Sequence, residues 1–218
     1  MDNMELWRSV CVTDPAAVKP ITGKPYKGNS PKPYWLIQRA TEVFGPCGQG
    51  WGVEVKSESF YRMTETDVMH SAVVRVWYMR DGQRATIEQM GQTKACYETG
   101  SGKMMVDEDA GKKSVTDGMV KCLSMIGFAG DIFSGRWDDS SYVAWARDET
   151  ARRENPCLSD EQIANIEALI TETKSDKAGL LKWVSGKAAA VVSNLGQVPQ
   201  EAYPSIVKKL EAKRKEAA

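Results

Sequence analysis

The segment 107–128, which reads DEDAGKKSVTDGMVKCLSMIGF, constrains the fold most, because it predicts one long helix with two different faces. Three carboxylates at its start suit the positive end of a helix dipole, and Gly127 is typical of a helix end. Apolar side chains recur every three or four residues, so they share one stripe, which we expect to be buried. The stripe consists of Val115, Met119, Cys122, Leu123 and Ile126.

The opposite face of this helix is polar and rich in lysine. Lys113, Asp117 and Lys121 follow one another at one-turn intervals, and Lys112 lies in the first turn. One interpretation is a solvated face on which Lys–Asp pairs stabilise the helix slightly. The other is a surface that contacts phosphate groups. The residues alone leave both interpretations open.

The chain before this helix predicts another helix and then an antiparallel sheet. Residues 34–44 have helical spacing, and Gly45 followed by a proline stops that helix. Three later segments follow the two-residue period of a strand, and an Asp-Gly turn joins the last two. These segments are 51–61, 72–79 and 84–90. We expect one face of this sheet to receive the apolar stripe.

Three other segments lack a clear period. Residues 19–33 form a basic loop, in which lysines occur without any acid. Tyr26 and Tyr34 interleave with these lysines. Residues 91–104 are predicted to be a loop or a short hairpin. Residues 131–147 are predicted to be irregular, with aromatic side chains that close the end of the core.

The last part of the chain predicts a separate helical module. Residues 148–157 are almost wholly polar and read as a linker, and Ser159 with Gln162 has the capping-box pattern that begins a helix. We therefore predict a main domain at 1–147 and a small all-helical module at 158–218. The expected fold class is α+β, with an antiparallel β-meander packed against the long helix.

Charge, cysteine usage and motifs exclude several classes of protein. The 29 Lys and Arg residues balance 29 Asp and Glu residues, so any nucleic-acid surface must be a local patch. The five cysteines are scattered without CxxC spacing, which indicates reduced thiols in a cytosol, and His70 is the only histidine. No apolar run is long enough to span a membrane, and GSGK at 100–103 lacks the full phosphate-loop pattern. We expect neither a membrane partner nor ATP binding.

Two segments resemble the RAD fifty-two family of single-strand annealing proteins. KKSVTDGMVKCLSMIGFAGDIFSG at 112–135 resembles that family's long helix. IQRATEVFGPCGQGWGVEV at 37–55 resembles its helix that breaks at Phe-Gly and re-enters as a strand through Gly-Trp. Residues 34–145 look closer to the phage and prophage annealing proteins of this superfamily, and the resemblance covers about half of the chain.

The resemblance implies a single-stranded DNA-binding recombination protein that anneals complementary strands without ATP, and that is not an enzyme. It implies no cofactor and no metal. It also implies a homo-oligomeric ring or helical assembly in the cytoplasm of a bacterial host cell, with DNA phosphates held in a basic groove. The C-terminal module is then expected to contact a phage exonuclease or the host single-strand-binding protein.

The resemblance also suggests which residues hold the DNA. Lys112 and Lys121 match basic positions of the family's helix, whereas Val120 and Ser124 stand where eukaryotic members carry basic residues, and Trp35 replaces an arginine. Annealing requires a grip on phosphates that leaves the base edges free, so cations with aromatic neighbours are the candidates. The predicted DNA-binding residues are Lys112, Lys113, Lys121, Lys32, Arg39, Arg75, Lys94, Lys103, Tyr34 and Trp35.

Two functions of other classes stay open. The first is a metal-dependent nuclease of phage recombination, because clustered carboxylates have the chemistry to hold Mg²⁺. The carboxylates are Asp107, Glu108, Asp109, Asp138 and Asp139. The second is a replication adaptor that does not bind DNA. Cleavage of labelled DNA with Mg²⁺ would indicate the nuclease, and absence of DNA binding would indicate the adaptor.

Overall fold

The chain has two compact units, as seen in a computed structural model that describes residues 2–22, 26–188 and 191–216. Contacts between Cα atoms divide the chain into Met1–Arg147 and Asp148–Ala218. The buried apolar cluster of the first unit and that of the second share no residue. Each unit therefore folds around its own buried side chains.

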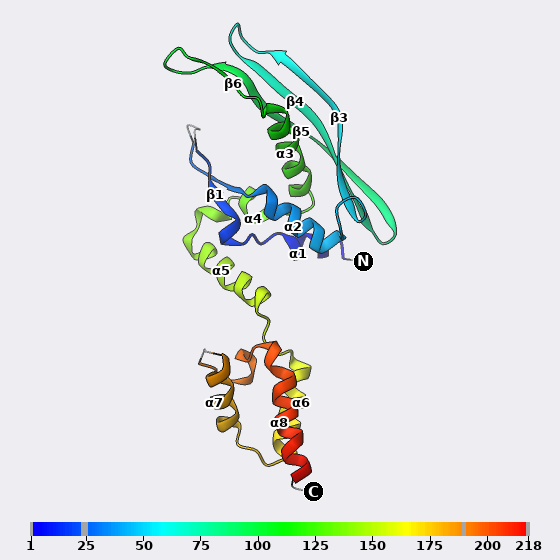
Figure 1. Cartoon of the computed structure of the whole chain (residues 1–218), viewed down its shortest axis with the longest axis vertical. Helices are drawn as coiled ribbons and strands as arrows, with labels where there is room; N and C mark the ends of the chain where they lie inside the picture. Colours follow the sequence, from blue (N-terminus) through cyan, green and yellow to red (C-terminus); the bar gives the residue numbers. More distant parts are fainter. Residues whose placement is uncertain (1, 23–25, 189–190, 217–218) are drawn as a thin grey trace. The chain divides into compact units, whose positions relative to one another are not determined.

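Four antiparallel strands form the main sheet of the first unit, in the order β3-β4-β5-β6. They are β3 (Trp51–Arg62), β4 (Val68–Arg80), β5 (Gln83–Glu98) and β6 (Met104–Val106). The sheet is curled, and a helix, α3, lies against one of its faces (Figure 1). The predicted α+β class and its β-meander are confirmed.

One strand is longer than the sequence pattern suggested. The prediction of a loop from residue 91 is wrong, because β5 continues to Glu98 and pairs with β4 beyond Gly91. Thr93 lies opposite His70 in this extension, and Lys94 lies opposite Met69. The turn follows at residues 99–103 and leads into β6, so the alternative of a short hairpin describes only the end of the segment.

Helix α3 (Ala110–Ser124) packs its apolar stripe against β4 and β5. The prediction of a buried stripe is confirmed for Met119, Cys122 and Leu123, while the other two members are partly buried against the same core. The helix is shorter than the predicted 107–128. Its leading carboxylates lie in a turn before Ala110, and the chain turns after Ser124 until Gly127 takes a φ of 105°. A left-handed φ of this kind favours glycine.

Two glycines bring the backbone of α3 close to the backbone of the sheet. A Cβ atom on Gly91 of β5 would collide with the carbonyl oxygen of Ser114. A Cβ atom on Gly118 of α3 would lie 2.6 Å from Cγ2 of Val74. The Ser114 hydroxyl also donates a hydrogen bond to the His70 carbonyl oxygen at 3.3 Å. Side chains at these two positions would hold the helix away from the sheet.

Short elements at the N-terminus place a second helix beside α3. They are α1 (Glu5–Val10), a 3-10 turn η1 (Pro15–Ala17), β1 (Val18–Pro20), β2 (Asn29–Pro31) and α2 (Pro33–Phe44). The prediction of a loop at 19–33 is wrong at its ends, because β1 and β2 pair antiparallel. Proline at the first position of α2 suits a helix start. Leu36 and Ala40 are fully buried, and the Phe44 ring stacks on Tyr78 with centroids 4.7 Å apart.

The segment after α3 is helical, not irregular as predicted. It contains α4 (Gly130–Phe133), a 3-10 turn η2 (Arg136–Asp138) and α5 (Ser140–Glu154), so residues expected to form a linker continue α5. The organising group is the buried Asp131 carboxylate. It accepts hydrogen bonds from the Thr13 amide and hydroxyl at 2.8 and 2.6 Å, from Trp137 Nε1 at 3.0 Å and from the Tyr142 hydroxyl at 3.1 Å. Aromatic periodicity alone does not reveal this network.

The second unit is helical, as predicted. It consists of α6 (Asp160–Glu172), α7 (Lys177–Ala188), the 3-10 turns η3 (Leu195–Gln197) and η4 (Gln200–Ala202), and α8 (Tyr203–Glu216). The predicted capping box is confirmed, since Ser159 accepts from the Gln162 amide and the Gln162 side chain accepts from the Ser159 amide. Ile166, Ile206 and Leu210 are at the centre of its core. Among the described residues, no helix is both long and apolar enough to cross a membrane.

Candidate nucleic-acid interface

A groove follows the outward face of α3 in the first unit, and we call it the α3 groove. The apolar stripe holds α3 on the sheet, so the residues on the other side of the helix face away from the core. The end of β2 and the first residue of α2 form the opposing wall, and the groove has a volume of about 480 Å³. Its lining residues are Ser30, Pro31, Pro33, Asp109, Lys112, Lys113, Thr116, Asp117 and Val120.

The two groove lysines are paired with carboxylates at the start of the helix. Lys113 Nζ lies 2.6 Å from an Asp107 oxygen, and Lys112 Nζ lies 2.9 Å from an Asp109 oxygen. Each hydrogen bond raises the pKa of its lysine, and the Lys112 bond lowers the pKa of Asp109. Both ammonium groups are therefore charged at neutral pH, and both are well exposed, so an incoming anion competes with a weak surface pair.

The middle of the groove combines a fixed carboxylate with an apolar side chain. Asp117 accepts a hydrogen bond from the Gln92 amide of β5 at 3.3 Å, which ties the outward face of the helix to the sheet. Val120 supplies an apolar surface one turn further along. Lys121 is exposed on the same helix but does not line the groove. The groove lining therefore carries two lysines and two carboxylates, with both lysines near the start of the helix.

A second groove is lined by Lys32, whose neighbours in the chain, Pro31 and Pro33, line the α3 groove. It has a volume of about 550 Å³ and runs between η1 and α2, lined by Lys32, Tyr34 and Trp35 among others. The Lys32 ammonium donates to the Ala16 carbonyl oxygen at 2.8 Å. The Tyr34 side chain is 85% exposed, whereas Trp35 packs partly against the core. These three predicted residues thus lie together, next to the α3 groove.

The remaining predicted cations lie outside both grooves. Arg39 of α2 pairs with Glu42 and donates to the Ser9 carbonyl oxygen. Lys94 pairs with Asp67 at 2.9 Å, and Lys103 lies in the turn between β5 and β6. None of the three lines the α3 groove.

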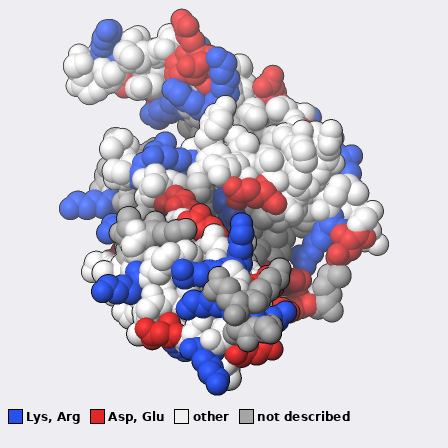
Figure 2. Space-filling view, turned by 60° about the horizontal axis from the view of Figure 1, so that its bottom comes forward, with Lys and Arg blue, Asp and Glu red and all other residues white. Residues whose placement is uncertain are grey.

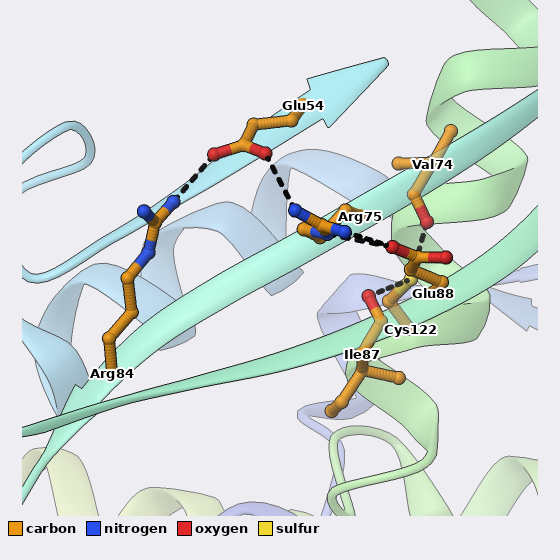
Figure 3. A network of polar contacts seen from close by, with 7 residues as sticks. All are labelled: Glu54, Val74, Arg75, Arg84, Ile87, Glu88 and Cys122. Atoms are coloured by element: carbon orange, nitrogen blue, oxygen red, sulfur yellow. Dashed lines mark hydrogen bonds and ion pairs between the residues drawn. The ribbon is translucent and has the colours of Figure 1, made fainter. Parts of the chain in front are cut away.

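Arg75 belongs to a polar network on the sheet face that α3 does not cover. Its guanidinium lies between Glu88, which accepts from Nε at 2.8 Å, and Glu54, 3.6 Å away, as Figure 3 shows. Glu54 also pairs with Arg84. Side chains alternate between faces along a strand, and Val74, beside Arg75, contacts α3. Arg75 therefore points away from the lysines with which it was grouped.

Sequence reasoning missed the opposing wall of the α3 groove. Ser30, Pro31 and Pro33 are about 80 positions from Lys112 in the chain, and no periodicity links them. The basic composition of residues 19–33 was the only available signal, and it pointed to Lys32 and the tyrosines. Thr116 was also missed, although its one-turn spacing from Lys112 and Lys113 places it on the same face.

Charges of both signs are mixed over the surface, and candidate metal ligands are scattered. Figure 2 shows blue and red side chains interspersed over one face of the molecule, in keeping with the equal numbers of acidic and basic residues. Within the described ranges, no three His, Cys, Asp or Glu side chains are placed to hold one metal ion. Cys47, Cys96, Cys122 and Cys157 are free thiols. The two lysines of the α3 groove likewise have carboxylates beside them.

The fold and groove define an α+β domain whose long helix presents two exposed lysines to a groove. Residues 33–138 match the model of the Rad52/22 family of double-strand break repair proteins. The matched stretch lies in the first unit and includes α2, the sheet and α3 with its lysines. This match supports DNA recombination and annealing at the level of the family. Among curated proteins, no relative matches the chain.

Proposed function

We propose that this protein binds single-stranded DNA along the α3 groove and anneals complementary strands without ATP. The observation that carries the proposal is that the matched residues 33–138 contain Lys112, Lys113, Thr116 and Val120 on one accessible helix face. Phosphate contacts position a nucleic acid without reading its sequence, and lysine is a compact point charge suited to that task. A strand held by its phosphates keeps its base edges free for pairing.

The assembly and setting follow from the same resemblance. We propose a homo-oligomeric ring or helix in the cytoplasm of a phage-infected or lysogenic bacterium. Two lysines per chain make a small site, and repetition along an assembly multiplies a weak affinity. The C-terminal unit would serve a phage exonuclease or the host single-strand-binding protein. Its separate core is consistent with a separate task.

The proposal is tested by mixing the purified protein with two complementary labelled strands in the absence of ATP. We expect duplex formation faster than in protein-free buffer. The variant Lys112→Ala with Lys113→Ala should bind single strands more weakly at every sequence. Log affinity falls as log salt concentration rises, and each lost phosphate contact should make this slope shallower by about 0.7.

A matched control removes the same charge elsewhere. Lys182 of α7 and Lys208 of α8 are exposed lysines of the second unit, and replacing both by alanine should leave affinity unchanged. If the groove variant binds like the wild type, the phosphates lie elsewhere. Cleavage of the labelled strands with Mg²⁺ would indicate the metal-dependent nuclease. Absence of any DNA binding by the wild type would indicate the replication adaptor.

A further inference from the structure

We propose that a pocket between α7 and α8 of the second unit binds an acidic peptide segment of a partner protein, with one apolar side chain of that segment inserted. This inference deepens the partner role proposed above for the C-terminal unit and rests on it. The two helices lie beside each other in Figure 1, and both contribute lining residues. We call this site the α7–α8 pocket.

The floor of the α7–α8 pocket is apolar and fixed by the core of the second unit. Leu180 of α7 is 5% exposed and Leu210 of α8 is 1% exposed, and both line the pocket. Trp183 lines it as well and packs partly against the same core. The pocket has a volume of about 320 Å³. This volume is at the lower end of the range for ligand sites, about 300–1,000 Å³, which suits a side chain better than a large cofactor.

Two lysines one turn apart on α8 form the rim of the α7–α8 pocket. Lys209 and Lys213 are both exposed and both line the pocket. The Lys209 ammonium lies 4.9 Å from the centre of the Trp183 ring, so the charge is held over the aromatic wall. Like charges four residues apart on a helix repel each other. An anion bound between them would relieve this repulsion.

The carboxylates of α6 neutralise other cations of the second unit. Lys177 of α7 pairs with Glu167 of α6 at 2.7 Å. Arg214 of α8 pairs with Glu172 of α6 at 3.4 Å. Within the residues that the structure describes, the two rim lysines form no ion pair. The sequence of α7 adds three lysines and no acid, so the face next to the pocket is basic.

Asp176 is the one carboxylate among the described residues that line this pocket, and it caps α7. One of its oxygens accepts from the Ala178 amide at 3.0 Å, and the other accepts from the Gly179 amide at 2.9 Å. A carboxylate at this position satisfies amides that the helix leaves unpaired. Both oxygens are thus engaged at the helix start, and the rim of the pocket keeps its positive charge.

These features favour a peptide over a nucleic acid. An apolar floor under a cationic rim is complementary to an apolar side chain with carboxylates beside it, and interface energy concentrates in such inserted anchors. Single-stranded DNA requires aromatic faces that are open for base stacking. Trp183 packs partly against the core, and one face of its ring already carries Lys209. The occupant is therefore an acidic segment with an apolar anchor.

The test titrates the full-length protein against a synthetic fluorescein-labelled peptide in which aspartates flank a single phenylalanine, with anisotropy as the readout. Lys209→Glu with Lys213→Glu should weaken binding about tenfold, because both rim charges are reversed. The matched control is Lys182→Glu with Lys208→Glu, which reverses two exposed lysines of the same helices outside the pocket and should bind like the wild type. Circular dichroism checks that both variants are folded.

Peptide variants test the same contacts without any change in the protein. Asparagine in place of the aspartates, or serine in place of the phenylalanine, should each weaken binding strongly. Equal losses in the two lysine variants, or full binding of the serine peptide, would overturn the pocket as the site. Displacement of the peptide from Lys112→Ala with Lys113→Ala by single-stranded DNA would overturn the peptide assignment and indicate a nucleic-acid surface.

The proposed annealing activity is measured separately on the same protein. A wild type that anneals strands but does not bind the peptide would overturn this inference and leave the annealing proposal in place. A wild type that binds the peptide through the rim lysines but does not anneal strands would support the pocket and overturn the annealing proposal.

Discussion

At the scale of single residues, the buried Asp131 carboxylate is the most informative group that the sequence patterns did not reveal. Thr13, its main partner, is 118 positions away, and Trp137 and Tyr142 follow at spacings without a helical or strand period. A buried carboxylate is tolerated only when hydrogen bonds satisfy it. The hydrogen bonds of Asp131 therefore join the N-terminal segment to the helices after α3. Charge patterns in a sequence do not distinguish it from its exposed neighbours Asp138 and Asp139.

We predict that Asp131→Ala destabilises the first unit strongly. The substitution leaves the Thr13 hydroxyl and the Trp137 indole N–H without their acceptor. Thr13 is fully buried and Trp137 is partly buried. The expected loss is about 3 kcal/mol of unfolding free energy. Urea denaturation measures it. Asp138→Ala, an exposed residue of the same region, should change the midpoint little, and an equal effect of both substitutions would contradict the role of the network.

Tyr142 gives this network a dependence on alkaline pH. Burial raises the pKa of its hydroxyl, and the Asp131 carboxylate, to which it donates, raises that pKa further. Because the pKa in the folded state is raised, the stabilisation is fully present below the ordinary value of 10.0 and is lost as the pH rises through the raised value. We expect urea midpoints to fall above about pH 10, and to fall less in Tyr142→Phe. Equal slopes in both proteins would contradict the assignment.

At the scale of elements, α3 shows what one-dimensional patterns can determine. The 3.6-residue period placed Met119, Cys122 and Leu123 in the core, because burial of a stripe depends only on helix geometry. The same geometry placed Lys112 and Lys113 on the outward face. Arg75 could not be placed in this way, since the residues that neutralise it, Glu54 and Glu88, come from neighbouring strands whose register the sequence does not give.

Gly91 explains why one strand was cut short in the prediction. A glycine inside an alternating segment reads as a strand end, yet here it marks the point where α3 approaches β5. Its function depends on Ser114 and Gly118, which belong to a different element. Close backbone contacts of this kind leave no period in the sequence.

We predict that Gly91→Ala lowers stability and displaces the groove lysines together. The added methyl group has no space against the Ser114 carbonyl, so α3 must shift away from the sheet. Overpacking of this kind should reduce the unfolding free energy by about 2 kcal/mol. Gly100→Ala is the control, because a Cβ atom there meets nothing within 4 Å. Thermal denaturation and single-strand affinity should both decline for Gly91→Ala, and wild-type behaviour would contradict the packing of α3.

At the scale of the whole molecule, the chain has two separate hydrophobic cores, and each core stabilises its own unit. The first cluster uses residues from Val10 to Ile132, with partly buried side chains as far as Trp137, and the second begins at Leu158. The second unit also has backbone contacts that start at Pro156, whose carbonyl oxygen accepts from the Gln200 amide at 2.8 Å. The apolar stripe of α6 therefore packs against the core of its own unit.

We predict that a fragment of residues 1–154 folds, assembles and binds single-stranded DNA as the full chain does. The sheet and the α3 groove both precede the cut, and ending at Glu154 keeps α5 whole with the Tyr142 hydroxyl bonded to Asp131. A cut at Arg147 falls inside α5, so that fragment should melt at a lower temperature. The fragment 155–218 should be helical by circular dichroism, because its core is complete by itself. It should not bind DNA, because it lacks the α3 groove. Assembly size, strand affinity and melting temperature are the measurements. Loss of assembly and affinity in 1–154 would show that the C-terminal unit belongs to the annealing core, whereas retention of both leaves that unit for contacts with a partner protein.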